Sequence, residues 1–260
     1  MFREYMFEQY VRSKSAILVV AGAMVLAAGL PHTASALEST GWDHSILLYL
    51  MGPSIEGEVG VGPITGDVDL DPSDVLENLE FGAMVGYRAQ KERWSVLVDL
   101  IYMDLAQGGM GDRGLATAEV GFDQLTLGFS GGYAIGRGTD VLFGVRWFDV
   151  SGDIRLESPI NSQRADFGDD WLDPLVGLRW EAPLGERWRF VGLGDVGGFG
   201  VGSDFTWQVS LSFHARISKS ISALLGYRHL DIDRESGSGP DRFLMKVSES
   251  GPAVGLKIGF

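Results

Sequence analysis

The stretch S-D-F-T-W-Q-V-S-L-S-F-H-A-R, from Ser203 to Arg216, decides the fold class. Every second residue from Phe205 to Ala215 is apolar, and the residues between them, from Thr206 on, are polar or charged. Successive side chains of an extended chain point to opposite sides, so this alternation predicts a β-strand with one apolar and one polar face. The apolar face could meet either a protein core or lipid, and the rest of the chain decides between the two.

Alternating segments of this kind recur along the whole chain. They are residues 44–51, 81–90, 94–105, 124–135, 140–151, 172–181, 188–197, 205–216, 221–231 and 252–260. Each has about the ten residues that a tilted strand needs to cross a bilayer, and an even strand number puts both chain ends on one side. The sequence therefore predicts an all-β protein, a single antiparallel transmembrane β-barrel of about ten strands. Eight or twelve strands are the alternatives if residues 52–79 pair differently.

The connections between these segments are sorted by length. Short turns, each with a basic residue, join every second pair of segments, at residues 91–93, 136–138, 183–187 and 218–220. The other connections are long, at residues 52–79, 106–122, 152–171 and 234–250, and only the one at residues 198–204 is short. Short turns on one side and long loops on the other are typical of a transmembrane barrel with its turns in the periplasm.

Aromatic residues gather near both ends of the predicted strands. Near the short turns they are Trp94, Tyr133, Trp180, Trp188, Phe213 and Phe260, and near the opposite ends they are Tyr102, Trp147, Phe205 and Trp207. Two such belts around an aliphatic band form the girdle of a membrane barrel. His214, Arg216 and Lys257 fall on the opposite, polar faces, which favours lipid outside and a small polar lumen inside over a dry protein core.

The N-terminal residues have the pattern of a secretory signal peptide. Three basic residues precede an apolar run at residues 16–30, and an A-x-A cleavage pattern ends at Ala36. We therefore predict a cleaved signal peptide at residues 1–36, which exports the chain across the inner membrane, and a barrel domain at residues 37–260.

Charge and composition exclude several classes of partner and site. Without residues 1–36 the chain keeps 18 basic residues (21 less 3) and 33 acidic residues (35 less 2), a net charge of −15. Such a surface argues against nucleic acid as a partner. There is no cysteine, and therefore no disulfide, thiolate metal site or cysteine nucleophile. We expect no cofactor and no metal site.

A Gly-x-Arg pattern recurs in four predicted strands, at residues 86–88, 144–146, 177–179 and 226–228. In the predicted register Gly and Arg face the lumen, and each Gly leaves room for an arginine. Charges in a confined interior should be paired, so we predict an ion-pair network that fills the lumen. Its predicted members are Arg88, Arg146, Arg179, Arg228, Arg216, Lys257, Asp99, Asp173, Asp195 and Glu181. The alternative is an arginine ladder that selects anions.

Residues 52–79 are acidic and contain no Lys or Arg. Asp71-Pro72-Ser73 followed by Val75, Leu76 and Leu79 predicts a short helix with an Asp N-cap and one apolar face. We predict that this helix, from Asp71 to Leu79, folds over or into the barrel mouth as a partial plug. The spacing of Asp67, Asp69 and Asp71 resembles a calcium loop but lacks its Gly and its closing Glu, so we assign no metal there.

Histidine chemistry is sparse in the barrel domain. His229 lies two residues from Asp231, a pair that could serve a hydrolase as base and orienting carboxylate. In the predicted register Arg228 faces the lumen, so His229 faces lipid or the aromatic belt, and no nucleophilic serine is marked. We predict no catalytic residues and no enzymatic activity.

With these features in place, the chain resembles the outer-membrane β-barrel proteins of Gram-negative bacteria. Its end resembles the signal that such proteins present to the barrel assembly machinery, namely Val254, Leu256, Ile258 and Phe260. Three stretches also resemble a poorly characterised family of small barrels: F-G-A-M-V-G-Y at 81–87, D-V-G-G-F-G-V-G-S-D-F-T-W-Q at 195–208 and G-Y-R at 226–228. The resemblance implies a fold and a location but no catalytic residues, because that family has none agreed.

Together these observations predict a non-enzymatic, integral outer-membrane protein, either structural or giving limited passage to small solutes. Its expected partners are outer-membrane lipid and lipopolysaccharide, the barrel assembly machinery and a small solute. The alternatives are a channel for a small hydrophobic or anionic solute, an adhesin that acts through its surface loops, and an outer-membrane hydrolase.

Overall fold

The computed structural model describes residues 41–110, 117–158 and 161–260. The predicted signal peptide lies outside the described residues. Residues 42–260 belong to one compact unit, which is built of β-strands except for α2 (Pro72–Asn78) and one 3-10 turn, η1 (Gly239–Asp241). Neither of these two helices is long and apolar enough to cross a membrane.

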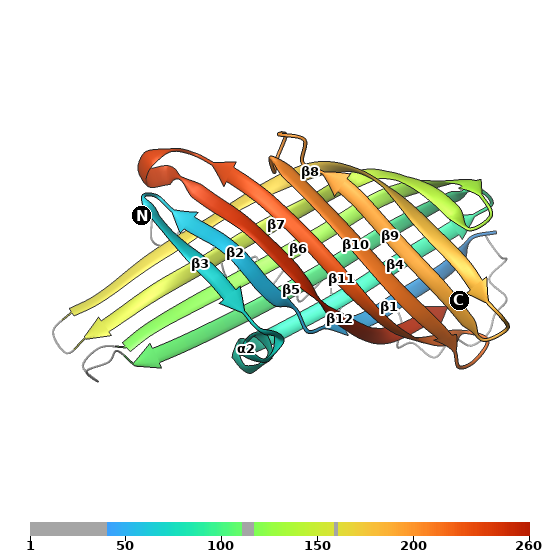
Figure 1. Ribbon diagram of the computed structural model, residues 1–260, viewed down its shortest axis with the longest axis horizontal. Helices are drawn as coiled ribbons and strands as arrows, with labels where there is room; N and C mark the ends of the chain where they lie inside the picture. The colour runs from blue at the N-terminus through green and yellow to red at the C-terminus, as the bar shows by residue number, and fades with distance from the viewer. Residues whose placement is uncertain (1–40, 111–116, 159–160) are drawn as a thin grey trace. The chain divides into compact units, whose positions relative to one another are not determined.

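Ten strands form a closed ring (Figure 1). They are β1 (Asp43–Met51), β4 (Leu79–Lys91), β5 (Trp94–Met110), β6 (Thr117–Gly136), β7 (Thr139–Ser158), β8 (Asn161–Leu184), β9 (Trp188–Gly197), β10 (Phe205–Arg216), β11 (Ile221–Ser236) and β12 (Phe243–Gly259). Each pairs antiparallel with the next, and β1 pairs with both β4 and β12, so that Leu48 stands opposite Val85 on one side and Leu256 on the other. The predicted ten-stranded antiparallel barrel is confirmed.

The short turns and both ends of the barrel sequence lie at one end of the ring (Figure 1). One of these turns shows why glycine is needed there. Gly138 has a φ of +76°, and a Cβ at this position would lie 2.1 Å from the carbonyl oxygen of Glu181 on β8. Only glycine adopts this conformation so close to a neighbouring strand without strain.

Three of the predicted long loops are largely strand, which corrects the sequence-based expectation for residues 106–122, 152–171 and 234–250. The β7–β8 ladder continues to Ser158 opposite Asn161, and the β11–β12 ladder continues to Ser236 opposite Phe243. Backbone N–H and C=O groups stay paired for as long as two antiparallel strands run side by side, whether or not lipid surrounds them. A strand length set by the bilayer thickness is therefore too short for these strands, and the barrel extends well beyond the membrane.

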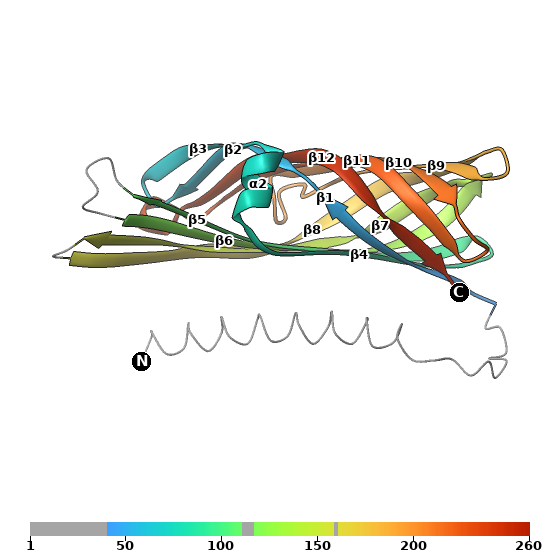
Figure 2. The ribbon, with the colours of Figure 1, turned by 90° about the horizontal axis from the view of Figure 1, so that it is seen from below.

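The acidic segment at residues 52–79 was also predicted as a loop with one helix, and only the helix is confirmed. Its first part forms a hairpin of β2 (Ser54–Val61) and β3 (Ile64–Leu70), which pairs with the extracellular half of β12. Among the described strands, β3 has no partner on its other edge. The helix α2 contacts β2, β3 and β5 and so lies in this gap of the wall (Figure 2).

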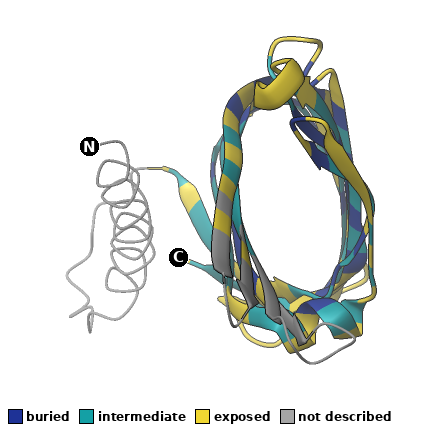
Figure 3. Ribbon diagram, turned by 90° about the vertical axis from the view of Figure 1, so that its left-hand side faces the viewer, coloured by how far each residue is buried: buried dark blue, intermediate teal, exposed yellow. Residues whose placement is uncertain are grey.

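The two faces of the strands meet different surroundings, as the alternation predicts. Phe129, Phe143 and Phe213 are about half exposed on the outside of the ring. Aromatic pairs sit near the short turns, with ring centroids 4.9 Å apart for Trp94 and Tyr133. Buried residues alternate with exposed ones along the strands (Figure 3), and the buried side chains of Arg146, Asp195 and Arg228 line the lumen. An aliphatic exterior with aromatic belts and a closed ring of strands is the architecture of a transmembrane barrel.

Candidate functional site

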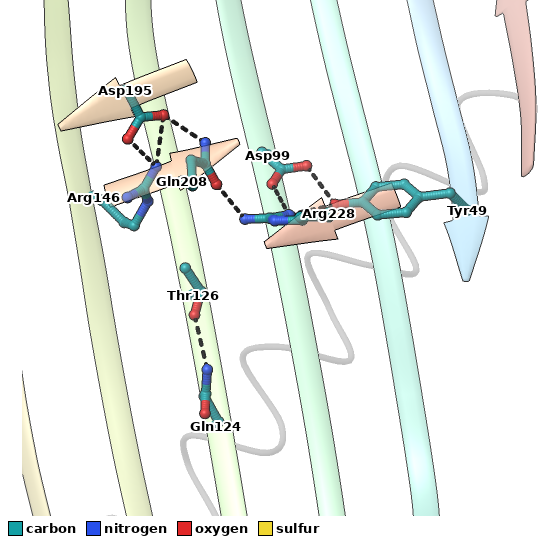
Figure 4. A network of polar contacts seen from close by, with 8 residues as sticks. All are labelled: Tyr49, Asp99, Gln124, Thr126, Arg146, Asp195, Gln208 and Arg228. Carbon is teal, nitrogen blue, oxygen red and sulfur yellow. Dashed lines mark hydrogen bonds and ion pairs between the residues drawn. The ribbon is translucent and has the colours of Figure 1, made fainter. Parts of the chain in front are cut away.

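The interior of the barrel is divided into levels along its axis. Near the short turns lies a set of ion pairs, which we call the periplasmic layer. Halfway up lies a second set, the middle layer, made of Tyr49, Asp99, Arg146, Asp195, Gln208 and Arg228 (Figure 4). Above it the inward side chains become apolar, and we call this extracellular part the cup. Each level takes its residues from many strands, because alternate residues of every strand face inward.

The middle layer begins with a buried ion pair between β7 and β9. One terminal nitrogen of Arg146 lies 2.8 Å and 2.9 Å from the two carboxylate oxygens of Asp195, and both side chains are almost fully buried. Gln208 on β10 donates its amide hydrogen to the same carboxylate over 2.5 Å. Asp195 is thus satisfied from two strands, as a buried carboxylate must be.

The same layer continues across the lumen to β5 and β1. Arg228 donates to the side-chain oxygen of Gln208 at 2.8 Å, to Asp99 at 2.8 Å and to the Tyr49 hydroxyl at 3.0 Å. The Tyr49 hydroxyl donates in turn to Asp99 at 2.8 Å. A continuous hydrogen-bonded chain therefore joins Arg146 on β7 to Tyr49 on β1, through side chains that reach over the lumen from six strands (Figure 4).

The periplasmic layer is a second chain of alternating charges. Arg88 lies 3.1 Å from Asp140, and Arg179 lies 3.8 Å from the same carboxylate. Arg179 and Arg189 both bind Glu181. Two carboxylates thus face three guanidinium groups, and the half-buried Lys257 lines the same lumen. Between this layer and the middle layer the lumen retains a cavity of about 210 Å³.

The structure brings together most, but not all, of the residues predicted for the network. Asp173 is fully buried but binds the backbone N–H and the hydroxyl of Ser203, at 2.6 Å and 2.7 Å, so it holds the β9–β10 connection instead of facing an arginine. Arg216 is exposed and donates to the carbonyl of Glu186 at the β8–β9 turn. These two residues lie outside both layers. The alternation along a strand predicts which face a side chain lies on, but it does not predict the level along the barrel axis that the side chain reaches.

The glycines of the Gly-x-Arg pattern do not make room for arginines, contrary to the prediction. A Cβ at Gly177 would lie 2.7 Å from the Cβ of Asp195, and one at Gly144 would lie 2.5 Å from the hydroxyl oxygen of Ser130. Each of these glycines accommodates the strand next to it. Gly177 in particular leaves space for Asp195, whose carboxylate then reaches Arg146.

Several members of the layers escaped the sequence analysis. Gln208 was recognised only as part of a polar face, because a neutral amide gives no charge signal. Asp140 and Arg189 lie at strand ends beside turns, where charged residues are usually solvated. Tyr49 reads as an ordinary apolar strand residue, and only the tertiary structure places its hydroxyl between Arg228 and Asp99.

The cup is lined by apolar side chains from the extracellular halves of the strands. Its buried cluster consists of Ile55, Val75, Met103, Leu105, Phe148, Val150, Trp171, Leu230, Ile232, Phe243, Met245 and Val247. These side chains enclose only part of the space, and a cavity of about 590 Å³ remains between β2, β3, α2 and β12 on one side and β5 to β8 on the other. The cavity is large enough for a small organic molecule.

The helix α2 contributes one wall of this cup. Asp71 is the N-cap of this helix, and the backbone N–H of Asp71 donates to the Asp74 carboxylate at 3.1 Å. Val75 is buried in the apolar cluster and Leu79 packs against it, whereas Leu76 is 57% exposed. The helix stands beside the opening, in the wall, and whether it restricts passage as a plug stays a prediction.

The bottom of the cup is polar and adjoins the middle layer. Glu249 on β12 and Gln124 on β6 both line the cavity, and the Gln124 amide donates to the Glu249 carboxylate at 2.6 Å. The sequence does not single out Glu249, because it predicts a loop at residues 234–250. The alternation of Phe243, Met245 and Val247 was a signal for this strand, although Leu244 between them obscured it.

No protein-family model matches this chain, and no curated protein sequence matches it. Solved structures of outer-membrane barrels do match. The translocator domain of the autotransporter NalP from Neisseria meningitidis is 15% identical over 96% of this chain and 98% of its own, with a TM-score of 0.45. The outer membrane protease OmpT from Escherichia coli is 9% identical over 84% and 96%, with a TM-score of 0.47. The P. putida toluene transporter TodX is 12% identical over 85% and 90%, with a TM-score of 0.31.

The ring itself decides the class, since all ten strands are paired on both edges and its outer face is apolar between aromatic belts. The protein is an integral outer-membrane β-barrel. Identities and TM-scores as low as those above carry no argument about what this barrel does, so its function has to be argued from its own interior.

His229, the residue considered for hydrolase chemistry, lies on the outer face of β11, with its ring centroid 4.5 Å from that of Trp207. Its neighbour Arg228 points inward, as predicted. Within the described ranges no three His, Asp or Glu side chains are grouped so that they could hold a metal ion.

Proposed function

We propose that this protein is a non-catalytic outer-membrane barrel that takes up a small hydrophobic solute from the outside into its cup. The middle layer below the cup restricts further passage, so that transfer through the lumen is limited. The proposal combines two of the functions that the sequence left open, the limited passage of small solutes and the binding of a hydrophobic solute.

The observation that carries the proposal is the apolar cavity of about 590 Å³ directly above the hydrogen-bonded middle layer. A structural barrel of this size would fill its interior with side chains, as small barrels generally do. An open apolar space in water is unfavourable, because its lining loses both contacts with protein and the benefit of burial. Its retention supports a role in binding.

The same layers argue against the alternative of an anion-selective arginine ladder. Arg88, Arg146, Arg179 and Arg228 each have a carboxylate within 4.0 Å. A guanidinium that is already paired and hydrogen-bonded attracts a passing anion weakly, since the neighbouring carboxylate cancels its field. The arginines therefore support the closure of the lumen better than they support selection.

Export and assembly belong to the same proposal. Residues 1–36 act as a cleaved signal peptide, and the end of β12 is recognised by the barrel assembly machinery. Val254, Leu256 and Phe260 are exposed on the outer face at the end of the barrel that carries the short turns, where an assembly factor could read them. Lipid and lipopolysaccharide then surround the aliphatic band.

Binding in the cup can be tested with 1-bromooctane, a neutral probe whose bromine quenches tryptophan fluorescence. Trp171 belongs to the apolar cluster, with its ring centroid 6.1 Å from that of Phe243, which lines the cavity. We expect saturable quenching of the folded barrel, which is lost in Trp171→Phe. Val150→Phe, which adds volume inside the cup, should weaken the binding at least tenfold.

The matched control is Val145→Phe on the same strand, because Val145 faces outward and is partly exposed to lipid. It should bind the probe like the wild type. Quenching that is non-saturable, or that is unchanged in Trp171→Phe and Val150→Phe, would show partition into detergent or lipid and would exclude the cup as a binding site.

A further inference from the structure

We infer that the cup recognises a hydrophobic amine, with the protonated amino group bound at the floor by Glu249 and Gln124 and the hydrocarbon part against the apolar wall. The inference rests on the proposed function, since it names the class of ligand that the cup takes. It is carried by two acceptor groups that the fold buries at the bottom of the cavity.

The first group is the side-chain oxygen of Gln124. This residue is only 2% exposed and lines the cavity, and its Oε1 has no hydrogen-bond partner in the part of the chain that the structure describes. The amide orientation is fixed, because the nitrogen must face the Glu249 carboxylate at 2.6 Å and only a donor can do so. The amide nitrogen faces the Thr126 hydroxyl, and the oxygen points away from Thr126 and the middle layer (Figure 4).

The second group is the carboxylate of Glu249, which is 8% exposed. No ion pair within 4.0 Å involves this residue among the described side chains. On the neighbouring strands its register partners are Leu230 and Ile55, which are apolar. The Gln124 amide donates a hydrogen bond to it, and a buried carboxylate normally requires more than one neutral partner.

The charged groups nearest to this floor are already engaged. Arg228 lies one inward position below Glu249, but its guanidinium binds Asp99, Tyr49 and Gln208. Asp99 and Asp195 of the middle layer are paired with Arg228 and Arg146, so that layer carries little net charge. A cation that enters from above therefore meets a carboxylate that has no ion-pair partner of its own within 4.0 Å among the described side chains, and the three N–H donors of an ammonium group match the free acceptors of Glu249 and Gln124.

The rest of the cavity fits the remainder of such a molecule. Its wall offers Val150, Phe243, Met245 and Val247 to a hydrocarbon chain. Asp67 and Asp74 also border the cavity, and their carboxylates make the local potential negative, which favours cations. The floor, wall and border thus select a small molecule that is cationic at one end and apolar at the other.

The test compares octylammonium with 1-octanol on the detergent-solubilised full barrel, both measured by titration calorimetry and by competition with 1-bromooctane. Because hydrogen bonds to a buried charged group contribute about 1.5–3 kcal/mol, the ammonium should bind on the order of 10- to 100-fold more tightly than the alcohol. In Glu249→Gln this ratio should fall to within about twofold. Octyltrimethylammonium, which is charged but has no N–H donor, should bind the wild type more weakly than octylammonium.

Glu235→Gln is the charge-matched control, because Glu235 pairs with Arg242 near η1 and does not line the cavity. It should keep the full preference for the amine. Equal binding of octylammonium and 1-octanol to the wild type would overturn the inference while the cup remains a binding site. If 1-bromooctane does not bind either, the proposed function itself fails. Should Glu249→Gln not fold, the three probes on the wild type still decide the matter.

Discussion

At the scale of single residues, the interior is governed by the cost of burying charge. Arg146 and Asp195 are both almost fully buried, so each depends on the other for its solvation. Removal of one partner leaves an uncompensated charge, which costs far more than the pair contributes when it is intact.

Arg146→Ala should therefore lower the free energy of unfolding by about 3–5 kcal/mol, because Asp195 loses its cation. The double variant Arg146→Met with Asp195→Leu should recover most of this loss, since no unpaired charge is left. The measurement is the unfolding midpoint in denaturant, followed by the heat-modifiable shift of the folded barrel on a gel. Arg137→Ala, at the exposed β6–β7 turn, is the control, and a loss of the same size there would contradict the argument.

A second residue-scale effect concerns Asp149, which faces outward two residues beyond Trp147, outside the membrane-spanning part. Burial raises the pKa of Asp149, and the carboxylates of Asp170, directly opposite on β8, and of Asp123 raise it further. A raised pKa in the folded state means that folding favours the protonated form. The ionised carboxylate therefore costs stability at neutral pH, and this cost disappears as the pH falls through the raised pKa.

Asp149→Asn should accordingly raise the melting temperature at pH 7, and this gain should shrink as the pH is lowered toward the ordinary aspartate range of about 4. Thermal unfolding followed by circular dichroism at several pH values measures it. Asp43→Asn, at the exposed start of β1, is the control for the substitution itself. A gain that grows on acidification would have the wrong sign and would refute the repulsion.

At the scale of elements, the extracellular wall depends on α2 because none of the described strands pairs with the outer edge of β3. A free strand edge exposes unpaired backbone groups and invites pairing with other chains. The helix covers this edge through one buried side chain, Val75, and its neighbour Leu76 contributes little.

Val75→Asp should release α2 from the wall, since an aspartate there would be buried without a partner. We expect fast hydrogen exchange at residues 72–78 and in β3, with the ring of ten strands still protected. Leu76→Asp, one residue away on the exposed face, should exchange like the wild type. If both variants exchange alike, the helix is not held by Val75.

The alternation of apolar and polar residues predicts the length of the strands poorly. The segments predicted for β7 and β8 covered the membrane-spanning part and at most a few residues beyond it, although these strands contain 20 and 24 residues. Outside the membrane the outer face no longer has to be apolar, so the alternation weakens while the backbone pairing persists. The hairpin of β2 and β3 was missed for the same reason, because its outer face carries acidic residues.

At the scale of the whole molecule, two ion-paired layers cross the lumen below the cup. Because these layers obstruct the lumen, we expect the refolded protein to give little or no steady ionic current in planar bilayers. The double variant Arg228→Ala with Asp99→Ala removes the ion pair at the centre of the middle layer without leaving one of its two charges unpaired, and it should raise single-channel conductance several-fold. Deletion of α2 tests the predicted plug in the same way.

The matched control for that measurement is Arg242→Ala with Glu235→Ala, which removes an ion pair of 2.7 Å from the extracellular extension, away from the lumen. Its conductance should equal that of the wild type. Large, stable currents from the wild type would contradict a closed middle layer, and a preference for anions in them would restore the arginine ladder.

The sequence by itself determined the class of fold and the face of the ring's strands that meets lipid, and it favoured ten strands over eight or twelve. It could do so because the period of two in extended chain and the length of a bilayer crossing are local properties, visible in Phe205 to Arg216 as in the membrane-spanning parts of the ring's other strands. Only the tertiary structure decided which inward residues meet. Ring closure brings Tyr49 beside Arg228 and Gln124 beside Glu249, which lie 179 and 125 positions apart in the chain. Heights in the lumen depend on the register of all ten strands together, so the layers, the cup and its floor have no local signature.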